Sequence, residues 1–172
     1  KTLMIRADMD ALPVQEIEGR PYGSTVHGKM HACGHDGHTA VGMTVAKLLA
    51  QLKGQLVGQV VTVFQPAEEI AAGAKAMLDE GFMRTLKPDA VLGFHLWSGL
   101  KSGEVGVREG FMWASMDQIK LTILGEGAHG GAPHLGTDSL LTGAHVVVAL
   151  QELLSREVNP FEPALFTQGI FR

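Results

Sequence analysis

Cysteine is nearly absent from this sequence, which has one in 172 residues, and no apolar run is long enough to cross a bilayer. A single cysteine cannot form an internal disulfide, so we expect a reducing compartment, the cytoplasm. Positive charge is also scarce, since 14 Lys and Arg face 18 Asp and Glu, the net charge is -4, and no basic stripe is visible. Because duplex binding requires a basic face, we expect no nucleic-acid partner, and we expect no membrane association.

The remaining composition is that of a globular protein. Hydrophobic residues make up 45% and charged residues 19% of the chain, and its length suits one domain plus part of another. Strand-like apolar runs stand at both ends without closing turns, so we expect an internal piece of a longer protein. The pattern changes after Trp113, and we place a domain boundary there, between residues 1–113 and 114–172.

Residues 1–113 alternate short apolar runs with helical patterns. The predicted elements are strands over 2–7, 57–64 and 90–94 and helices over 39–52 and 71–80. In the first helix the apolar positions at helix spacing are Val41, Val45, Leu48, Leu49 and Leu52. This succession is typical of parallel β-α-β units, so the predicted fold class is α/β, with a mixed, largely parallel sheet flanked by helices. Parallel strands end at one edge of the sheet, where open α/β sheets bind ligands.

Residues 114–172 carry a different pattern. Apolar and polar residues alternate over 119–124, which predicts a strand with one buried and one wet face, as in an antiparallel sheet. Asp138 is expected to cap a helix that continues to Leu154. Further strands are predicted over 103–110 and 164–171.

One stretch, Met30–His38, concentrates metal-binding atoms, because it holds the only cysteine and three of the eight histidines. Cys33 and His35 precede the predicted helix, where backbone N–H groups and the helix dipole favour a thiolate. Further candidate groups at the same sheet edge are Asp8, Glu68, Glu69 and His95. Mixed sulfur, nitrogen and oxygen ligands predict a catalytic metal site, because a structural zinc site would need more Cys or His at tight spacing. Zinc, manganese, cobalt and nickel all suit such ligands.

Other interpretations of these residues stay open at this point. Cys33 beside a histidine is also consistent with a nucleophilic pair, although a pair leaves the glutamates unexplained. Glu68 and Glu69 could instead form the charged first turn of a helix. If the chain is extended there, their side chains point apart, so that one binds metal and the other takes a proton from water. His31 and His38 are interpreted as supporting residues and not as ligands.

Five motifs together resemble a known family. They are Arg6–Pro13, His31–His38, Gln65–Glu69, Gly93–His95 and Gly127–His129, in the family's order and rough spacing. The family is that of the metal-dependent amidohydrolases that include hippurate hydrolase, N-acyl-amino-acid deacylases and plant auxin-conjugate hydrolases, within the aminoacylase superfamily. The resemblance implies an α/β catalytic domain in residues 1–113. It also implies part of a smaller α+β, ferredoxin-like lid in residues 114–172, through which two copies form a homodimer.

The resemblance implies a role for each candidate residue. Two divalent metal ions (zinc, manganese, cobalt or nickel) would be held by Cys33, His35, Glu69 and His95. Glu68 would be the general base and later the acid, Asp8 would orient the site, and His129 on the lid would stabilise the oxyanion. The implied reaction is hydrolysis of the amide bond of a small-molecule N-acyl amino acid by a metal-activated water.

Two residues depart from the wider superfamily, and both departures resemble the deacylase branch. Arg6 stands where the superfamily has a histidine, and Cys33 stands where it often has a bridging aspartate. The family also supplies a late metal-binding histidine that falls outside this sequence, so we expect the isolated chain to bind metal less well. The alternatives are a dipeptidase or carboxypeptidase of the same superfamily, and a non-catalytic metal-binding or dimerisation fragment.

Overall fold

The computed structural model describes residues 1–171. It divides the chain into two compact units, Lys1–Gly106 and Val107–Arg172, and each is described by itself. The assignment of 1–113 and 114–172 as catalytic and lid domains stays a prediction.

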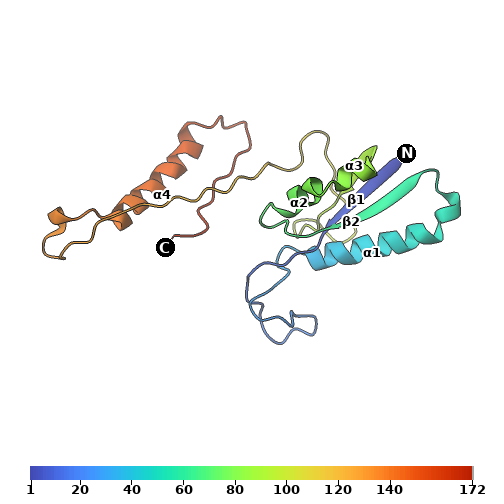
Figure 1. Cartoon of the computed structure of the whole chain (residues 1–172), viewed down its shortest axis with the longest axis horizontal. Helices are drawn as coiled ribbons and strands as arrows, with labels where there is room; N and C mark the ends of the chain where they lie inside the picture. The colour runs from blue at the N-terminus through green and yellow to red at the C-terminus, as the bar shows by residue number, and fades with distance from the viewer. Residues whose placement is uncertain (172) are drawn as a thin grey trace. The chain divides into compact units, whose positions relative to one another are not determined.

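The first unit is built on a three-stranded parallel sheet (Figure 1). Its strands are β1 (Thr2–Asp8), β2 (Gln59–Gln65) and β3 (Ala90–Gly93), in the order β2-β1-β3. Asp8 pairs with Gln65, and Arg6 pairs with Gly93, so all three strands end at the same edge. The predicted α/β class and the parallel pairing are therefore confirmed.

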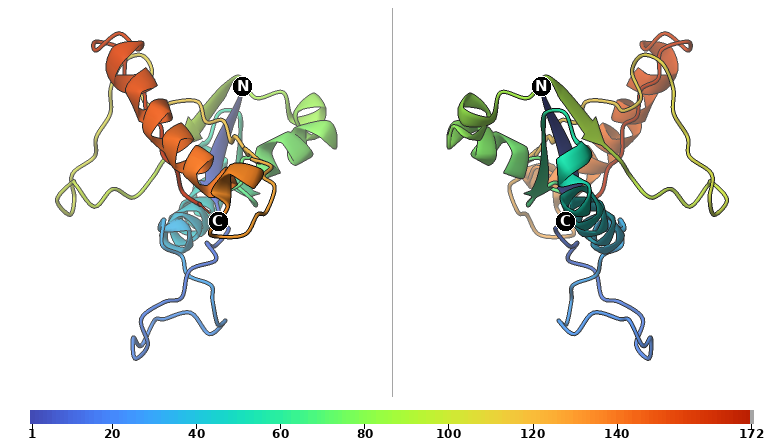
Figure 2. Two further views of the ribbon diagram at one scale, coloured as in Figure 1. Left: turned by 90° about the vertical axis from the view of Figure 1, so that its left-hand side faces the viewer. Right: turned by 90° about the vertical axis from the view of Figure 1, so that its right-hand side faces the viewer.

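Helices flank this sheet. They are α1 (His35–Gln51), the 3-10 turn η1 (Lys53–Gln55), α2 (Gly73–Asp79) and α3 (Phe82–Leu86). Figures 1 and 2 show α1 on one side of the sheet and the α2–α3 pair on the other. The long connection between β1 and α1 extends away from the sheet as a loop, as its polar, glycine-containing sequence predicts (Figure 2).

The core of the first unit lies between β1, β2 and α1. Met4, Ile5, Ala7 and Val63 are its buried hydrophobic side chains. The helix approaches the sheet closely at Gly42, where an added Cβ would stand 3.1 Å from both Ala7 Cβ and Phe64 Cε1. A side chain at this position would push α1 away from the strands, so glycine is what permits the tight packing.

The first helix begins four residues earlier than its apolar pattern predicts, at His35 in place of Thr39. Gly34 precedes it with φ of 87°, a left-handed conformation that glycine adopts without steric cost. The fully buried positions of α1 are His35, His38 and Gly42, which recur at helix spacing. The predicted aliphatic stripe is therefore only partly the buried face: Val41, Leu48 and Leu52 are exposed.

The second unit contains one long helix, α4 (Ser139–Arg156), and a 3-10 turn, η2 (Pro133–Leu135). Asp138 caps α4 as predicted, since its carboxylate accepts a hydrogen bond of 2.8 Å from Leu141 N. The strands predicted over 103–110, 119–124 and 164–171 do not form in the described chain. A strand requires a neighbouring strand to pair its backbone groups, and alternating hydrophobicity cannot supply that partner.

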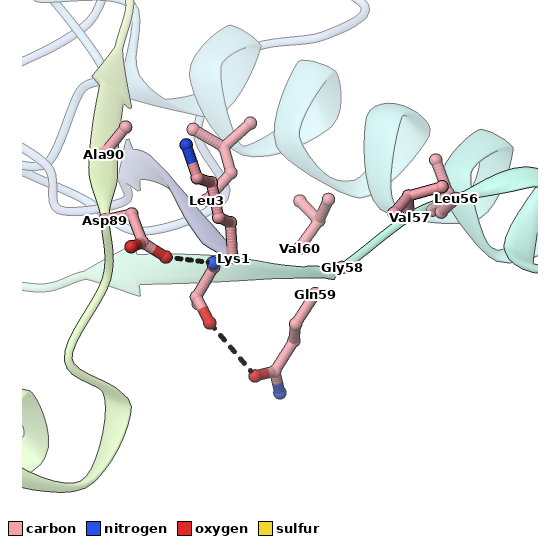
Figure 3. Close-up of a pocket in the computed structure, with 10 residues that line it drawn as sticks. Lys1, Leu3, Leu56, Val57, Gly58, Gln59, Val60, Asp89 and Ala90 are labelled. Atoms are coloured by element: carbon pink, nitrogen blue, oxygen red, sulfur yellow. Dashed lines mark hydrogen bonds between the residues drawn. The ribbon is translucent and has the colours of Figure 1, made fainter.

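A cavity of about 330 Å³ lies at the amino ends of the three strands (Figure 3). Its lining includes Leu3, Val57, Gln59 and Asp89, and the Asp89 carboxylate accepts a 2.6 Å hydrogen bond from Thr2 N. It therefore stands at the end of the sheet opposite to the predicted site. No helix in the described part of the chain has the length and apolarity needed to span a membrane.

Candidate metal centre

The predicted ligands from the first unit meet at the carboxyl edge of the sheet. Three groups of side chains each have ligand atoms within 4.8 Å of one another, and His35 belongs to all three. The groups are Cys33 with His35 and His95, His35 with Glu68 and Glu69, and Asp8 with His35 and His38. Parallel strands and the start of α1 thus gather residues that are far apart in the sequence.

His35 stands at the centre of these groups, with one ring nitrogen that has no hydrogen-bond partner. Its Nδ1 lies 3.0 Å from the backbone oxygen of Asp10, which can only accept, so Nδ1 carries the proton. The other nitrogen, Nε2, is buried without a hydrogen-bond partner and stands 3.8 Å from an oxygen of both Glu68 and Glu69. Because an unpaired buried lone pair is costly, this nitrogen is suited to a cation.

The two glutamates lie on a turn, so neither the extended segment nor the helix first turn, the two alternatives left open by the sequence, describes them. Ala67 has φ of 49°, and its backbone oxygen accepts a hydrogen bond of 3.1 Å from Gly73 N, which closes the turn. Both carboxylates therefore approach the same imidazole and do not point apart. They differ in burial, because the side chain of Glu68 is 38% exposed and that of Glu69 is 20% exposed.

Cys33 and His95 form the other side of the site. Cys33 Sγ stands 3.4 Å from His95 Nε2, and His95 Nδ1 donates to the backbone oxygen of Leu96 over 2.6 Å. The Nε2 lone pair of His95 is therefore directed to the same place as the sulfur. This arrangement brings sulfur and imidazole ligands into the contact that the sequence predicts.

The protonation state of Cys33 corrects the prediction of a thiolate favoured by the helix terminus. Burial, with the negative charge and hydrogen bonding of Glu69, raises the pKa of the Cys33 thiol to about 11 in the absence of a cation. Glu68 and Asp8 act in the same direction. Burial and the carboxylates together thus outweigh the helix dipole, and a cation is the group that would reverse the effect of the carboxylates. The raised pKa also disfavours the nucleophilic cysteine interpretation.

Two supporting residues are more deeply involved than the sequence indicates. The Asp10 carboxylate accepts a hydrogen bond of 3.1 Å from Glu69 N, and its backbone oxygen holds His35. Burial opposes ionisation of Asp10, but the backbone N–H groups of Glu69 and Glu68 outweigh it and lower the pKa of this carboxyl below its usual value. His38, interpreted only as a supporting residue, is completely buried beside Asp8. The sequence signal that could have identified both residues was the presence of an aspartate or a histidine close to the end of a strand or helix.

The remaining two predicted residues have structural partners of their own. Asp8 is buried and forms an ion pair of 2.9 Å with Arg6 Nη1, while its Oδ1 stands 3.7 Å from His35 Nε2. His129 belongs to the second unit, where its Nδ1 accepts a hydrogen bond of 3.1 Å from Gly131 N. The proton of a neutral His129 therefore sits on Nε2, which is available as a donor.

The donor set fits divalent cations. Sulfur, imidazole nitrogen and carboxylate oxygen converge, and the buried atoms His35 Nε2 and Glu69 Oε1 form no hydrogen bond with the described residues. Bare carboxylates beside a thiol and imidazoles are uncommon in structural zinc sites and are typical of catalytic ones. A parallel α/β sheet with such ligands at its carboxyl edge is characteristic of metallohydrolases.

Comparison with known proteins agrees with this class. The sequence profile of peptidase family M20/M25/M40 matches residues 4–165, and the chain belongs to this family. It is 44% identical to the N-acyl-L-amino acid amidohydrolase of Geobacillus stearothermophilus over 97% of this chain and 45% of that protein. The chain therefore spans less than half the length of this relative.

Two solved structures are also similar. A protein from methicillin-resistant Staphylococcus aureus that is described as an aminohydrolase matches with a TM-score of 0.72 and 40% identity, over 99% of this chain and 45% of that one. A dinuclear metal-binding peptidase of the M20 family from Bacillus subtilis matches with a TM-score of 0.60 and 49% identity, over 63% of this chain and 30% of that one. The second of these structures is described as binding two metals, and the ligand-like groups of the first unit lie on the same kind of fold.

Proposed function

We propose that the complete protein hydrolyses the amide bond of small N-acyl amino acids with the help of two divalent cations. The observation that carries this proposal is the convergence of Cys33, His35, Glu69 and His95 around unpaired buried ligand atoms. The similarity to an N-acyl-L-amino acid amidohydrolase supports the substrate class.

The ligand residues would be Cys33, His35, Glu69 and His95. Zinc, manganese, cobalt and nickel all suit this mixture of donors. Bound cations of this kind lower the pKa of a water toward about 7 and polarise a carbonyl oxygen. His35 is fixed for this role, because its bond to the Asp10 backbone oxygen keeps the proton on Nδ1.

Glu68 is the residue that moves the proton. Its carboxylate is close to His35 but more exposed than that of Glu69, so it can reach a water and the leaving group. It would take a proton from the attacking water and deliver it to the departing amine. Asp8, paired with Arg6, would keep the histidines around it oriented.

His129 is the proposed donor to the oxyanion. Its Nδ1 accepts from Gly131 N, so the Nε2 proton is available for a hydrogen bond to negative charge that develops on the substrate oxygen. Dimerisation through residues 114–172 and a cytoplasmic location stay predictions of the sequence.

The test is Glu68→Gln in the complete protein. Glutamine keeps the size of the side chain but cannot take a proton, so kcat on an N-acyl amino acid should fall by roughly 10²–10⁴-fold while bound metal is retained. Glu69→Gln should instead lose metal, and Glu80→Gln, on an exposed residue, should change neither. Unchanged turnover in Glu68→Gln would contradict the proposed mechanism.

A second candidate is peptide hydrolysis, because one similar structure is a dinuclear metal-binding peptidase. A panel that compares hippurate with free-amine dipeptides separates the two activities. A preference for dipeptides would replace the proposed substrate class. A third possibility is a fragment that binds metal without catalysis. It is tested by measuring metal content and turnover on residues 1–172 alone.

A further inference from the structure

His38 is a buried histidine that could be mistaken for a metal ligand. Its ring is fully buried, and Asp8, His35 and His38 form one of the three ligand-like groups. Both of its nitrogens, however, are already engaged by the protein: Nδ1 stands 2.5 Å from Asp8 Oδ1, and Nε2 accepts a hydrogen bond of 2.8 Å from Leu96 N. His38 therefore has no lone pair left for a cation.

These two partners fix the tautomer of His38. The carboxylate of Asp8 can only accept, and the backbone N–H of Leu96 can only donate. The ring must therefore carry its proton on Nδ1 and its lone pair on Nε2. Asp8 is in turn held by the ion pair with Arg6, so the acceptor offered to Leu96 has a fixed position.

The Leu96 peptide controls His95 from two sides. Leu96 directly follows His95, and its backbone oxygen accepts the hydrogen bond from His95 Nδ1. The same ring presents Nε2 to Cys33 Sγ. The N–H belongs to the peptide group that joins Leu96 to His95, and the oxygen belongs to the next peptide group, so a movement of the Leu96 backbone changes both the backbone of His95 and the direction of its ring.

Side-chain packing supports the contact between His38 and the segment His95–Leu96. The rings of His38 and His95 lie edge to face with centroids 4.5 Å apart. The side chain of Leu96 lies against Gly34, which precedes α1, and against Gly37 in its first turn, where an added Cβ would collide with it. The segment that follows β3 is thus fastened to the start of α1 by one hydrogen bond and by close contact.

We propose that His38 is a positioning residue for His95, acting through the Leu96 backbone N–H to set the Cys33–His95 geometry. This inference rests on the proposed function, because it assumes that Cys33 and His95 hold a cation. The sequence of contacts is Arg6, Asp8, His38, Leu96 and then His95.

The experiment uses two amide variants of His38 in the complete protein. Gln places an acceptor near the position of Nε2 and keeps the contact with Leu96, whereas Asn places a donor near Nδ1 and keeps only the contact with Asp8. Val63→Ala, a buried change in β2, is the control for lost stability. Co²⁺ is titrated into each variant, and the thiolate-to-cobalt absorption reports whether Cys33 and the histidines still coordinate together.

We expect His38→Asn to bind Co²⁺ roughly tenfold or more weakly with a reduced thiolate band, as for other residues that orient ligands, while His38→Gln resembles wild type. A normal band and affinity in His38→Asn would overturn the inference, as would an equal loss in Val63→Ala. If the wild-type protein itself shows no thiolate band, the proposed metal site is contradicted. This result differs from a normal band in His38→Asn, which contradicts only the positioning role of His38.

A measurement on the wild-type protein covers the case in which His38→Asn does not fold. Nitrogen-15 NMR of the ring should show a protonated Nδ1 and a coupling between His38 Nε2 and the Leu96 amide nitrogen. The opposite tautomer, or no coupling to Leu96, would overturn the inference without any variant.

Discussion

At the scale of single residues, the site works by fixing where each proton lies. Asp10 keeps the His35 proton on Nδ1, and Leu96 does the same for His95, so that the other nitrogen of each ring is left as a ligand. Neutral imidazole, thiolate and carboxylate are the forms that bind metal. Cys33 does not begin in its metal-binding form, because burial and the neighbouring carboxylates hold it as a thiol.

The raised pKa of Cys33 predicts slow alkylation without a cation. With a pKa of about 11, the folded thiol is protonated below that pH, so roughly one in a thousand is ionised at pH 8. The iodoacetamide rate in metal-stripped protein should therefore rise about tenfold per pH unit from 8 to 10. The same chain in urea is the control and should level off near the ordinary thiol pKa. A plateau below pH 9 in the folded protein would refute the prediction.

At the scale of elements, the turn between β2 and α2 determines where the glutamates lie. Ala67 and Ala71 both have positive φ, at 49° and 52°, which is unusual for residues with a Cβ and marks local strain. Gly73 permits the turn, since its nitrogen bonds Ala67 O and its α-carbon lies against the Pro66 backbone oxygen. The turn thereby directs Glu68 and Glu69 to His35.

Gly73→Ala should disrupt this turn. The new Cβ would collide with the Pro66 backbone oxygen, so the backbone must move, at a cost of about 2 kcal/mol in unfolding free energy. Denaturant unfolding measures that cost, and metal titration should show weaker binding because the glutamates shift. Gly54→Ala is the matched control, because nothing lies within 4 Å of its added Cβ. Equal metal affinity in both variants would count against a positioning role for the turn.

At the scale of the whole molecule, we expect metal binding and folding of the first unit to be coupled. The proposed ligands come from the loop before α1, from α1 itself, and from the segments after β2 and β3, and they meet only when the sheet and helix are in place. A cation that binds them stabilises the folded state by mass action. The second unit, in contrast, contributes none of these ligands.

Adding Zn²⁺ should therefore raise the Tm of the first unit. At a free concentration 100 times Kd the stabilisation is about 2.7 kcal/mol, which corresponds to a rise on the order of 10 °C. Differential scanning calorimetry with and without a chelator measures it. Asp138→Ala, which removes the cap of α4, should lower the stability of the second unit and leave the zinc-induced rise unchanged. No rise with Zn²⁺, Mn²⁺, Co²⁺ or Ni²⁺ would contradict a metal site.

Much of the first unit could be predicted because its signals are local. Short apolar runs ended by Asp8, Pro66 and His95 predicted the strands, and residues at or just after those ends supplied most of the candidate ligands. The start of α1 could not be predicted from apolar spacing, since its first buried residues are His35 and His38. The strands of the second unit were predicted wrongly, because alternation indicates a face to bury and does not supply a partner.

The sequence by itself determined which atoms are available: one thiol, histidines in a glycine-rich stretch and paired glutamates after a strand, each a consequence of residue type and order. Only the tertiary structure decided which of them meet, which nitrogen of each ring keeps its proton, and that Cys33 is a thiol without a cation. The physical reason is that proton positions and pKa values depend on burial and on neighbours within a few ångströms, and those neighbours come from segments that folding alone brings together.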